Sequence, residues 1–258
     1  MTDGIASMFA LDGRRALVTG ASRGIGRAIA EVFATAGADI AVHYHARADL
    51  ADQVAGRIAA SGRRAVTLQA DLAQPGAGAE LLRRARAALG PIDIVVLNAA
   101  EQRRQDLDAV DDAAYALQTG TGFRSAFEIA REALPAMREA RFGRLIAIGS
   151  VQQIRPNAQL TVYAAMKAAL SNLMRNLAKS SGPVGITCNA ILPGLIATDR
   201  SAEVQADPVA YEALLSRIPC RREGDPREVA ALALYLAGPM GGYATGGEYL
   251  VDGGLALP

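Results

Sequence analysis

The chain has 258 residues, of which 51% are hydrophobic and 21% are charged, and its formal net charge is +1. This composition suits a globular protein with a substantial core, whereas the near-zero charge and the 5% aromatic content argue against nucleic acid or an anionic membrane as a partner. Because the first residues show no secretory signal and no apolar run approaches the roughly 18 residues of a membrane span, we expect a cytoplasmic protein.

Short apolar runs alternate with longer stretches of helical periodicity along nearly the whole chain. Residues 15–19 predict a first strand, and residues 27–36 predict a helix that ends at Gly37. Further strands are predicted at residues 39–44, 64–69, 92–97, 144–148, 185–192 and 248–251, and further helices at 49–60, 78–89, 161–180 and 225–236, with a long helical region between 97 and 144. This alternation predicts an α/β fold, a doubly wound parallel sheet of seven strands with helices on both faces, in a single domain over residues 1–258.

A glycine-rich turn, residues 19–26, joins the first strand to the first helix. Its glycines permit a tight turn and a close approach of the backbone to a phosphate, and the following helix N-terminus offers unpaired N–H groups to that anion. The spacing is G-x-x-x-G-x-G rather than the commoner G-x-G-x-x-G, but the strand–turn–helix context predicts a dinucleotide site. The residues assigned to cofactor binding here are Gly20, Ser22, Arg23, Gly24, Ile25 and Gly26.

The second strand indicates which dinucleotide binds. It ends at Tyr44, which we place beside the cofactor, and no acidic residue follows directly to hold a free adenosine ribose. Arg23 and Arg47 suit a 2′-phosphate instead, although both could be ordinary surface charges, so we expect NADP(H) in preference to NAD(H). The only two histidines, His43 and His45, do not form a convincing metal pair, and the two cysteines form no CxxC pair, so we expect neither a metal site nor a histidine-based triad.

Lysine is rare in this chain, which has only Lys167 and Lys179 among its 27 basic residues. Lys167 follows Tyr163 by four residues, a spacing that places both side chains on one helix face. An ammonium beside a phenol favours the phenolate, and a tyrosine in that setting can exchange a proton with a carbonyl or alcohol oxygen. Such a pair also occurs on ordinary amphipathic helices, so its interpretation depends on the rest of the chain.

Several ordered motifs together resemble the short-chain dehydrogenase/reductase family over nearly the whole chain. They are residues 19–26, Asp71, Asn98–Ala100, Ser150, Tyr163 with Lys167, Asn189–Gly194 with Thr198, Pro219–Pro226, Thr245–Gly247 and Asp252–Gly254. The resemblance implies a Rossmann fold and hydride transfer between a nicotinamide cofactor and a carbonyl or secondary alcohol.

The resemblance also implies the role of each site residue. Ser150 would hydrogen-bond the substrate oxygen, Tyr163 would transfer the proton, and Lys167 would promote ionisation of that tyrosine and hold the nicotinamide ribose. Further cofactor contacts would come from the adenine side, from the end of the fourth strand and from the nicotinamide side. These contacts are Asp71, Leu72, Asn98, Ala99, Pro193, Gly194, Ile196 and Thr198.

The chain departs from the family pattern at two places. Gly122 stands where the family has an asparagine that supports an irregular helical turn, so the side-chain part of that role is lost. Ala100-Glu101 stands where the family usually has a glycine after Asn-Ala, and this adds a carboxylate close to the cofactor and substrate. Two alternatives therefore stay open: a catalytically weakened NADP(H)-binding protein, and an interaction module that binds no nucleotide.

The substrate is expected to be a small molecule. Polar residues at 101–104 and 151–156 would line the pocket mouth and favour a sugar, polyol or keto acid, while 3-oxoacyl-carrier-protein reductase is the alternative suggested by the resemblance. The family also implies a substrate lid over about residues 195–218. It further implies a homotetramer, or a homodimer, in which the long helices around Phe127 and Leu170 pair across a two-fold axis.

Overall fold

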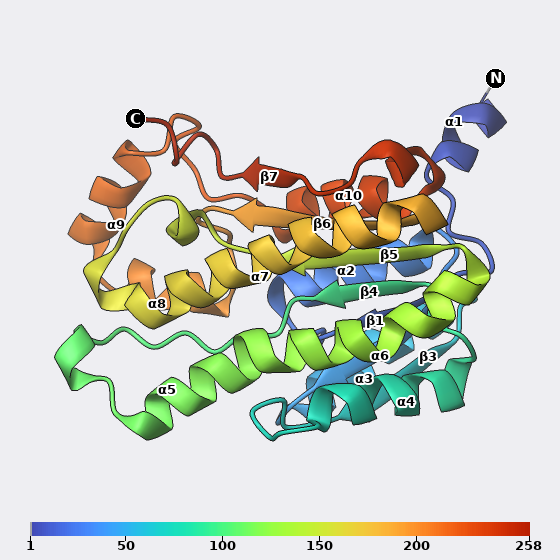
Figure 1. The fold of residues 1–258 in the computed structure, drawn as a ribbon. Coiled ribbons are helices and arrows are strands. Elements are labelled where there is room, and N and C mark those ends of the chain that lie inside the picture. Colours follow the sequence, from blue (N-terminus) through green and yellow to red (C-terminus); the bar gives the residue numbers. More distant parts are fainter. Residues whose placement is uncertain (1) are drawn as a thin grey trace.

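The computed structural model describes residues 2–258, and a seven-stranded parallel sheet forms its centre (Figure 1). The strand order is β3-β2-β1-β4-β5-β6-β7, and every neighbouring pair is parallel. The strands are β1 (Arg15–Val18), β2 (Asp39–Tyr44), β3 (Ala65–Gln69), β4 (Ile94–Leu97), β5 (Gly143–Ile148), β6 (Ile186–Pro193) and β7 (Glu248–Val251). The chain reverses direction across the sheet between β1 and β4, where open α/β sheets bind their ligands. The predicted fold class is confirmed.

Helices cover both faces of the sheet (Figure 1). One face carries α2 (Gly24–Thr35), α3 (Ala48–Ala60) and α10 (Pro226–Ala237). The other face carries α4 (Ala77–Leu89), α5 (Asp112–Thr119), α6 (Ser125–Ala140) and α7 (Thr161–Ser181). Three short helices were not predicted from the sequence: α1 (Thr2–Met8), α8 (Asp199–Gln205) and α9 (Pro208–Ser216). Both α8 and α9 lie beyond the carboxyl ends of the strands, within the segment expected to be the lid.

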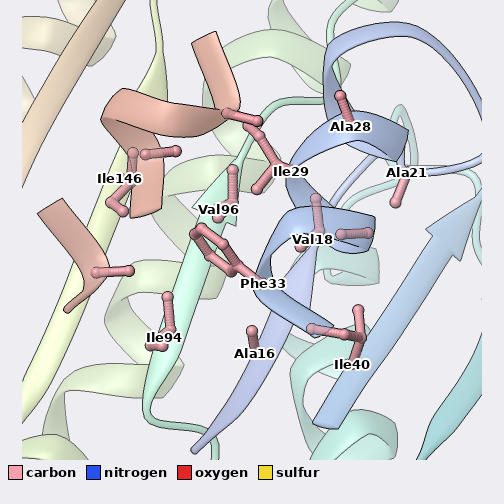
Figure 2. Packing of buried hydrophobic residues seen from close by; sticks show 14 of the residues in the cluster. Ala16, Val18, Ala21, Ala28, Ile29, Phe33, Ile40, Ile94, Val96 and Ile146 are labelled. Carbon is pink, nitrogen blue, oxygen red and sulfur yellow. The ribbon is translucent and has the colours of Figure 1, made fainter. Parts of the chain in front are cut away.

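The core consists of two apolar layers, one on each side of the sheet. Alternate residues of a strand point to opposite faces, so Val18 and Val96 pack with Phe33 of α2 in one layer (Figure 2). Leu17 and Val95 pack in the other layer, beneath α4, α6 and α7. Because a shift of one residue would turn each apolar side chain to the wrong layer, this pattern fixes the strand register and aligns the strand ends at one edge. Within residues 2–258, no helix is long and apolar enough to cross a membrane.

Candidate active site

The predicted site residues follow the carboxyl ends of four neighbouring strands. Thr19 follows β1, Asn98 follows β4, Ser150 comes two residues after β5, and Gly194 follows β6. Parallel strands end at the same edge of the sheet, so these residues are gathered there from positions far apart in the sequence. The glycine turn and the catalytic candidates therefore share one edge, as the motif order predicts.

Tyr163 and Lys167 lie one turn apart on α7, and both are buried, with 6% and 2% of their surfaces exposed. The ammonium nitrogen Nζ of Lys167 donates a hydrogen bond to the carbonyl oxygen of Ile148 at 2.5 Å and lies 5.6 Å from the centre of the Tyr163 ring. Since Ile148 is the last residue of β5, this bond ties α7 to the strand end that carries Ser150. The ammonium, the phenol and the serine thus occupy the same part of the edge.

Ser150 begins a short 3-10 turn, Val151–Gln153, and its side chain caps that turn. Its hydroxyl oxygen accepts a hydrogen bond from the N–H of Gln152 at 3.2 Å, which leaves the hydroxyl proton available for donation. The Gln153 side chain accepts from the Ser150 N–H at 3.3 Å and donates to the hydroxyl of Ser171 on α7 at 2.9 Å. Gln153 was expected at the pocket mouth, but the structure turns its amide inward, where it holds the backbone of Ser150 against α7.

The departure at Gly122 lies inside a turn of π-helix, Gly120–Arg124, between α5 and α6. Gly120 packs so closely on the main chain of residue 73 that an added Cβ would lie 2.9 Å from the Ala73 carbonyl oxygen. An added Cβ at Gly122 would lie 3.2 Å from Cε of Met166, the neighbour of Lys167. The irregular turn is therefore kept without asparagine, and the Met166 side chain fills the space beside Gly122.

The second departure places a carboxylate near the expected pocket mouth. The Glu101 side chain is 43% exposed and pairs with Arg103 at 3.7 Å. This pairing offsets its charge locally, and the exposure lets water solvate it. Glu101 therefore lies at the rim and adds no unpaired charge to the interior of the site.

The glycine turn packs closely between the start of α2 and the end of β4. An added Cβ at Gly26 would lie 2.3 Å from the Gly20 carbonyl oxygen and 2.6 Å from Nδ2 of Asn98, so only glycine fits there. The Asn98 amide donates to the carbonyl oxygens of Thr19 and Gly20 at 2.7 and 3.1 Å, which links the end of β4 to the turn. The helix begins after Arg23 without a side-chain cap and without an acidic residue in its first turn. Such an N-terminus leaves N–H groups for a pyrophosphate, so these residues fit a dinucleotide.

His43 holds the glycine turn in place, a role that the sequence analysis missed. Its ring is 2% exposed, and Nδ1 accepts a hydrogen bond from the Gly20 N–H at 2.9 Å. This fixes the neutral tautomer, in which Nε2–H donates to the Ala70 carbonyl oxygen at 3.1 Å. Burial lowers the pKa of His43 from 6.5 to about 4. Only its place on a buried strand beside the glycine turn could have signalled this role.

The neutral, buried His43 predicts a specific loss of stability in acid. Above pH 6.5 the ring is neutral in both folded and unfolded chains, so its full contribution is present; as the pH falls toward 4, only the unfolded chain takes up the proton. The free energy of unfolding should fall by about 2.5 kcal/mol between pH 7 and 4.5 through this group alone. Urea unfolding measures this fall. In His43→Asn the free energy of unfolding should decrease by about 2.5 kcal/mol less than in wild type between pH 7 and 4.5, whereas the exposed-site control His45→Asn should show the wild-type decrease. Equal losses in wild type and His43→Asn would contradict the neutral ring.

The residues predicted to contact the adenine, Asp71, Leu72 and Tyr44, differ in how far they are buried and in which groups they can offer to a cofactor. The Asp71 carboxylate accepts hydrogen bonds from the Gln74 side chain at 2.9 Å and from the Ala73 N–H at 3.0 Å. Both bonds lower the pKa of Asp71, and the bond from Gln74 has the larger effect. Leu72 is 3% exposed and packs into the core, so only its main chain could contact a cofactor. Tyr44 is half-buried at the end of β2. An adenine at this place would therefore contact the Asp71 carboxylate and main-chain groups rather than the Leu72 side chain.

The predicted nicotinamide-side residues form the base of the expected lid. Gly194 donates to the Val251 carbonyl oxygen at 3.0 Å, and Ile196 forms a β-bridge with Gly224, so the start of the segment is held against β7 and against the chain that follows the segment. Ile196 itself is 6% exposed and packs into the core. Thr198 faces the glycine turn, since an added Cβ at Gly24 would lie 3.2 Å from its Cγ2. This brings the predicted phosphate and nicotinamide residues face to face.

The larger cavity lies away from this chemistry. A hollow of about 690 Å³ opens at the amino ends of the strands and is lined by residues such as Ala10, Gly37 and Arg63. A second cavity of about 230 Å³ lies at the base of the lid. Neither is lined by Ser150 or by the Tyr163–Lys167 pair, so we place the site by its chemical groups rather than by cavity size. In the part of the chain that the structure describes, no cluster of three or more His, Cys, Asp or Glu side chains could hold a metal ion.

Comparisons with known proteins show which families of protein this chain resembles. A family profile described as enoyl-(acyl carrier protein) reductase matches residues 20–256. L-Rhamnose 1-dehydrogenase (NAD(P)(+)) of Azotobacter vinelandii is 38% identical over 244 residues, which cover 93% of this chain and 95% of that protein.

Two solved structures extend the likeness to three dimensions. A 3-oxoacyl (acyl-carrier-protein) reductase from Agrobacterium tumefaciens with NADP bound is 38% identical, with a TM-score of 0.91 and 96% of each chain covered. A candidate NAD(P)-dependent gluconate 5-dehydrogenase from Beutenbergia cavernae with bound NADP is 33% identical, with a TM-score of 0.90 and coverage of 96% of this chain and 98% of that one. This chain is therefore an oxidoreductase that belongs to the short-chain dehydrogenase/reductase family.

Proposed function

We propose that this protein interconverts a secondary alcohol and a carbonyl on a small hydroxylated substrate, a sugar, polyol or keto acid, with NADP(H) as the preferred cofactor. The observation that carries the proposal is the bond from Lys167 to the Ile148 carbonyl, which brings the ammonium and Tyr163 to the strand end with Ser150. The uncapped start of α2 faces the same edge and would hold the pyrophosphate.

The site residues divide the work of carbonyl reduction. When bound, the dinucleotide supplies the hydride to the carbonyl carbon. Negative charge then grows on the carbonyl oxygen, where Ser150 donates a hydrogen bond and Tyr163 donates its proton. The Lys167 ammonium, 5.6 Å from the ring centre, stabilises the phenolate that forms. In alcohol oxidation the same groups act in reverse, with the phenolate of Tyr163 as the base.

A hydroxylated substrate is supported by the side-chain amide oxygen of Gln152, two residues after Ser150. Oε1 of Gln152 is buried and has no hydrogen-bond partner among the described residues, although an unpaired buried acceptor costs about 1–3 kcal/mol. The Gln152 N–H donates to the Ser150 hydroxyl, so a substrate held by Ser150 would lie near this residue, and one of its hydroxyls would supply the missing donor. The rhamnose and gluconate dehydrogenases named above are similar in sequence and fold, which supports the same substrate class.

Reduction of a 3-oxoacyl group on a carrier protein is the second candidate. The likeness to the reductase from Agrobacterium tumefaciens favours it. A third candidate is a weakened enzyme that only binds NADP(H). It is favoured by Gly122, because this position lacks the asparagine side chain that the family has there. The first two candidates predict different substrates and the third predicts no turnover, so turnover measurements separate them.

A substrate panel tests the proposal directly. Sugars, polyols, keto acids and a 3-oxoacyl thioester are offered in both directions with NADP(H) and NAD(H), and absorbance at 340 nm is followed. We expect turnover of a hydroxylated member, with a higher kcat/KM for the phosphorylated cofactor, because Arg23 and Arg47 follow β1 and β2 at the edge where the adenosine ribose is expected. Turnover of the thioester alone would favour the second candidate, and NADPH binding without any turnover would favour the third.

We also propose that residues 195–218 form the substrate lid and that the chain assembles as a homotetramer, with a homodimer as the alternative. The lid is supported by α8 and α9, which rise from the Ile196–Gly224 bridge. Assembly through α5 and α6 is supported by the exposed Tyr115 and Phe127 rings. Leu170 itself is 2% exposed in the core, so a contact made by α7 would use other residues of that helix. The mass from light scattering distinguishes these assemblies from a monomer.

A further inference from the structure

Two ion pairs stand at the edge of the sheet where β1 and β2 end. Nη1 of Arg23, in the glycine turn, lies 3.2 Å from a carboxylate oxygen of Asp199, the first residue of α8. The Arg47 guanidinium donates two hydrogen bonds to Asp49, at 2.8 and 2.6 Å. Each of the two arginines expected to recognise a 2′-phosphate is therefore already engaged by a carboxylate.

The two pairs form one charge cluster. The Arg47 hydrogen bonds lower the pKa of Asp49 to about 2, and Asp49 in turn raises the pKa of Arg47. Asp199 also contributes to that rise in the pKa of Arg47, so its charge acts on both arginines. The positive charges of the two guanidinium groups are thus offset by the negative charges of the two carboxylates near the end of β2, where a dinucleotide fold places the adenosine ribose.

Asp199 differs from Asp49 in its position on the chain. It belongs to the segment proposed as the lid, next to Thr198, which faces the glycine turn across from Gly24. The Arg23 and Asp199 side chains are 61% and 68% exposed, so water and salt screen their pairing and it adds little to folding stability. Its effect is therefore expected on a ligand that competes for Arg23 rather than on the fold.

We propose that Asp199 is a specificity-determining residue for the cofactor, because its carboxylate competes with the 2′-phosphate of NADP(H) for Arg23. This inference rests on the proposed function. A bound 2′-phosphate must displace Asp199 from Arg23 or stand beside it, and a nearby carboxylate repels a phosphate. NAD(H) lacks that phosphate and leaves the Arg23–Asp199 pair intact. The native chain consequently accepts both cofactors with modest discrimination.

The variant Asp199→Asn removes the charge and keeps the size of the side chain. We expect it to bind NADPH about three- to tenfold more tightly than wild type and NADH within about twofold, as the removal of one screened charge predicts. Fluorescence titration of each cofactor gives the two dissociation constants. The gain for NADPH should shrink at 0.5 M NaCl, where exposed charges are screened over shorter distances.

Two controls isolate the contact. Glu212→Gln removes another exposed lid carboxylate, on α9, which forms no ion pair within the described part of the chain, and it should leave both constants unchanged. In an Arg23→Ala background, Asp199→Asn should gain clearly less NADPH affinity than in the wild-type background, because the competition for Arg23 is gone and only the longer-range effect of the Asp199 charge remains.

The outcomes separate this inference from the proposed function. If wild type binds both cofactors and Asp199→Asn leaves their ratio unchanged, or tightens both equally, the inference fails while the proposed function stands. If wild type binds neither nicotinamide dinucleotide, the proposed function is wrong and the inference is overturned with it.

Discussion

Replacing Tyr163 with Phe is expected to lower kcat by about 10³-fold while leaving NADPH affinity within about twofold. The ring is 6% exposed in α7, so the change removes one hydroxyl and keeps the packing of the ring. Without the phenol, Ser150 still donates a hydrogen bond to the carbonyl oxygen, but no positioned group delivers the proton. The loss should therefore fall on the chemical step rather than on binding.

Steady-state rates with the best member of the substrate panel, together with NADPH titration, measure this split. Tyr115→Phe is the matched control, because its ring is 56% exposed on α5 and should retain wild-type kcat. Survival of most of the activity in Tyr163→Phe would remove this tyrosine from the mechanism. Loss of NADPH binding with unchanged kcat would assign it to the cofactor instead.

Gly26→Ala is expected to weaken NADPH binding by about 30-fold or more, a change of about 2 kcal/mol. The new Cβ would lie 2.3 Å from the Gly20 carbonyl oxygen, and main chain cannot yield as a flexible side chain can. The turn must therefore shift away from α2, which moves the N–H groups that would meet the pyrophosphate. Overpacking of this kind should also cost about 1–3 kcal/mol of unfolding free energy.

NADPH titration and urea unfolding measure the two effects of Gly26→Ala. The control is Gly56→Ala on α3, where an added Cβ has no neighbour within 4 Å. That change should stabilise the protein by about 0.5–1 kcal/mol, because alanine favours a helix over glycine, and leave binding unchanged. Normal NADPH affinity in Gly26→Ala would show that the turn does not hold the cofactor.

The strands were predictable because both layers of the core impose a strong pattern on them. Buried parallel strands are apolar on both faces, and each predicted strand begins and ends within about two residues of its observed bounds. Helices α8 and α9 were missed because they lie at the surface, where no apolar face marks them. The start of α9 carried the same signal as α10, since Asp207 caps it and Pro208 follows, as Asp225 and Pro226 do for α10.

Residues that touch the reacting groups were easier to find than those that hold them. Tyr163 and Lys167 follow a spacing that any helix converts into one face. His43 and Gln153 act through contacts with Gly20 and Ser150. The His43 contact depends on which strands become neighbours, so no local pattern marks it. The Gln153 contact did have a local signal, since Ser150 and Gln153 have the spacing of a capping box.

Isotope transfer in wild type and in a Tyr163 variant shows whether this tyrosine, beside Lys167 on α7, exchanges a proton with the substrate oxygen while the attached carbon exchanges hydride with the dinucleotide. Wild type and Tyr163→Phe are mixed in single turnover with NADPH that carries deuterium at the reactive ring carbon and with the best carbonyl substrate. The account predicts deuterium on the alcohol carbon of the wild-type product, and a rate at least about 10³-fold lower in the variant. Saturating NADPH binding by wild type with no transfer of deuterium to any substrate of the panel, or equal transfer rates in both proteins, would contradict it.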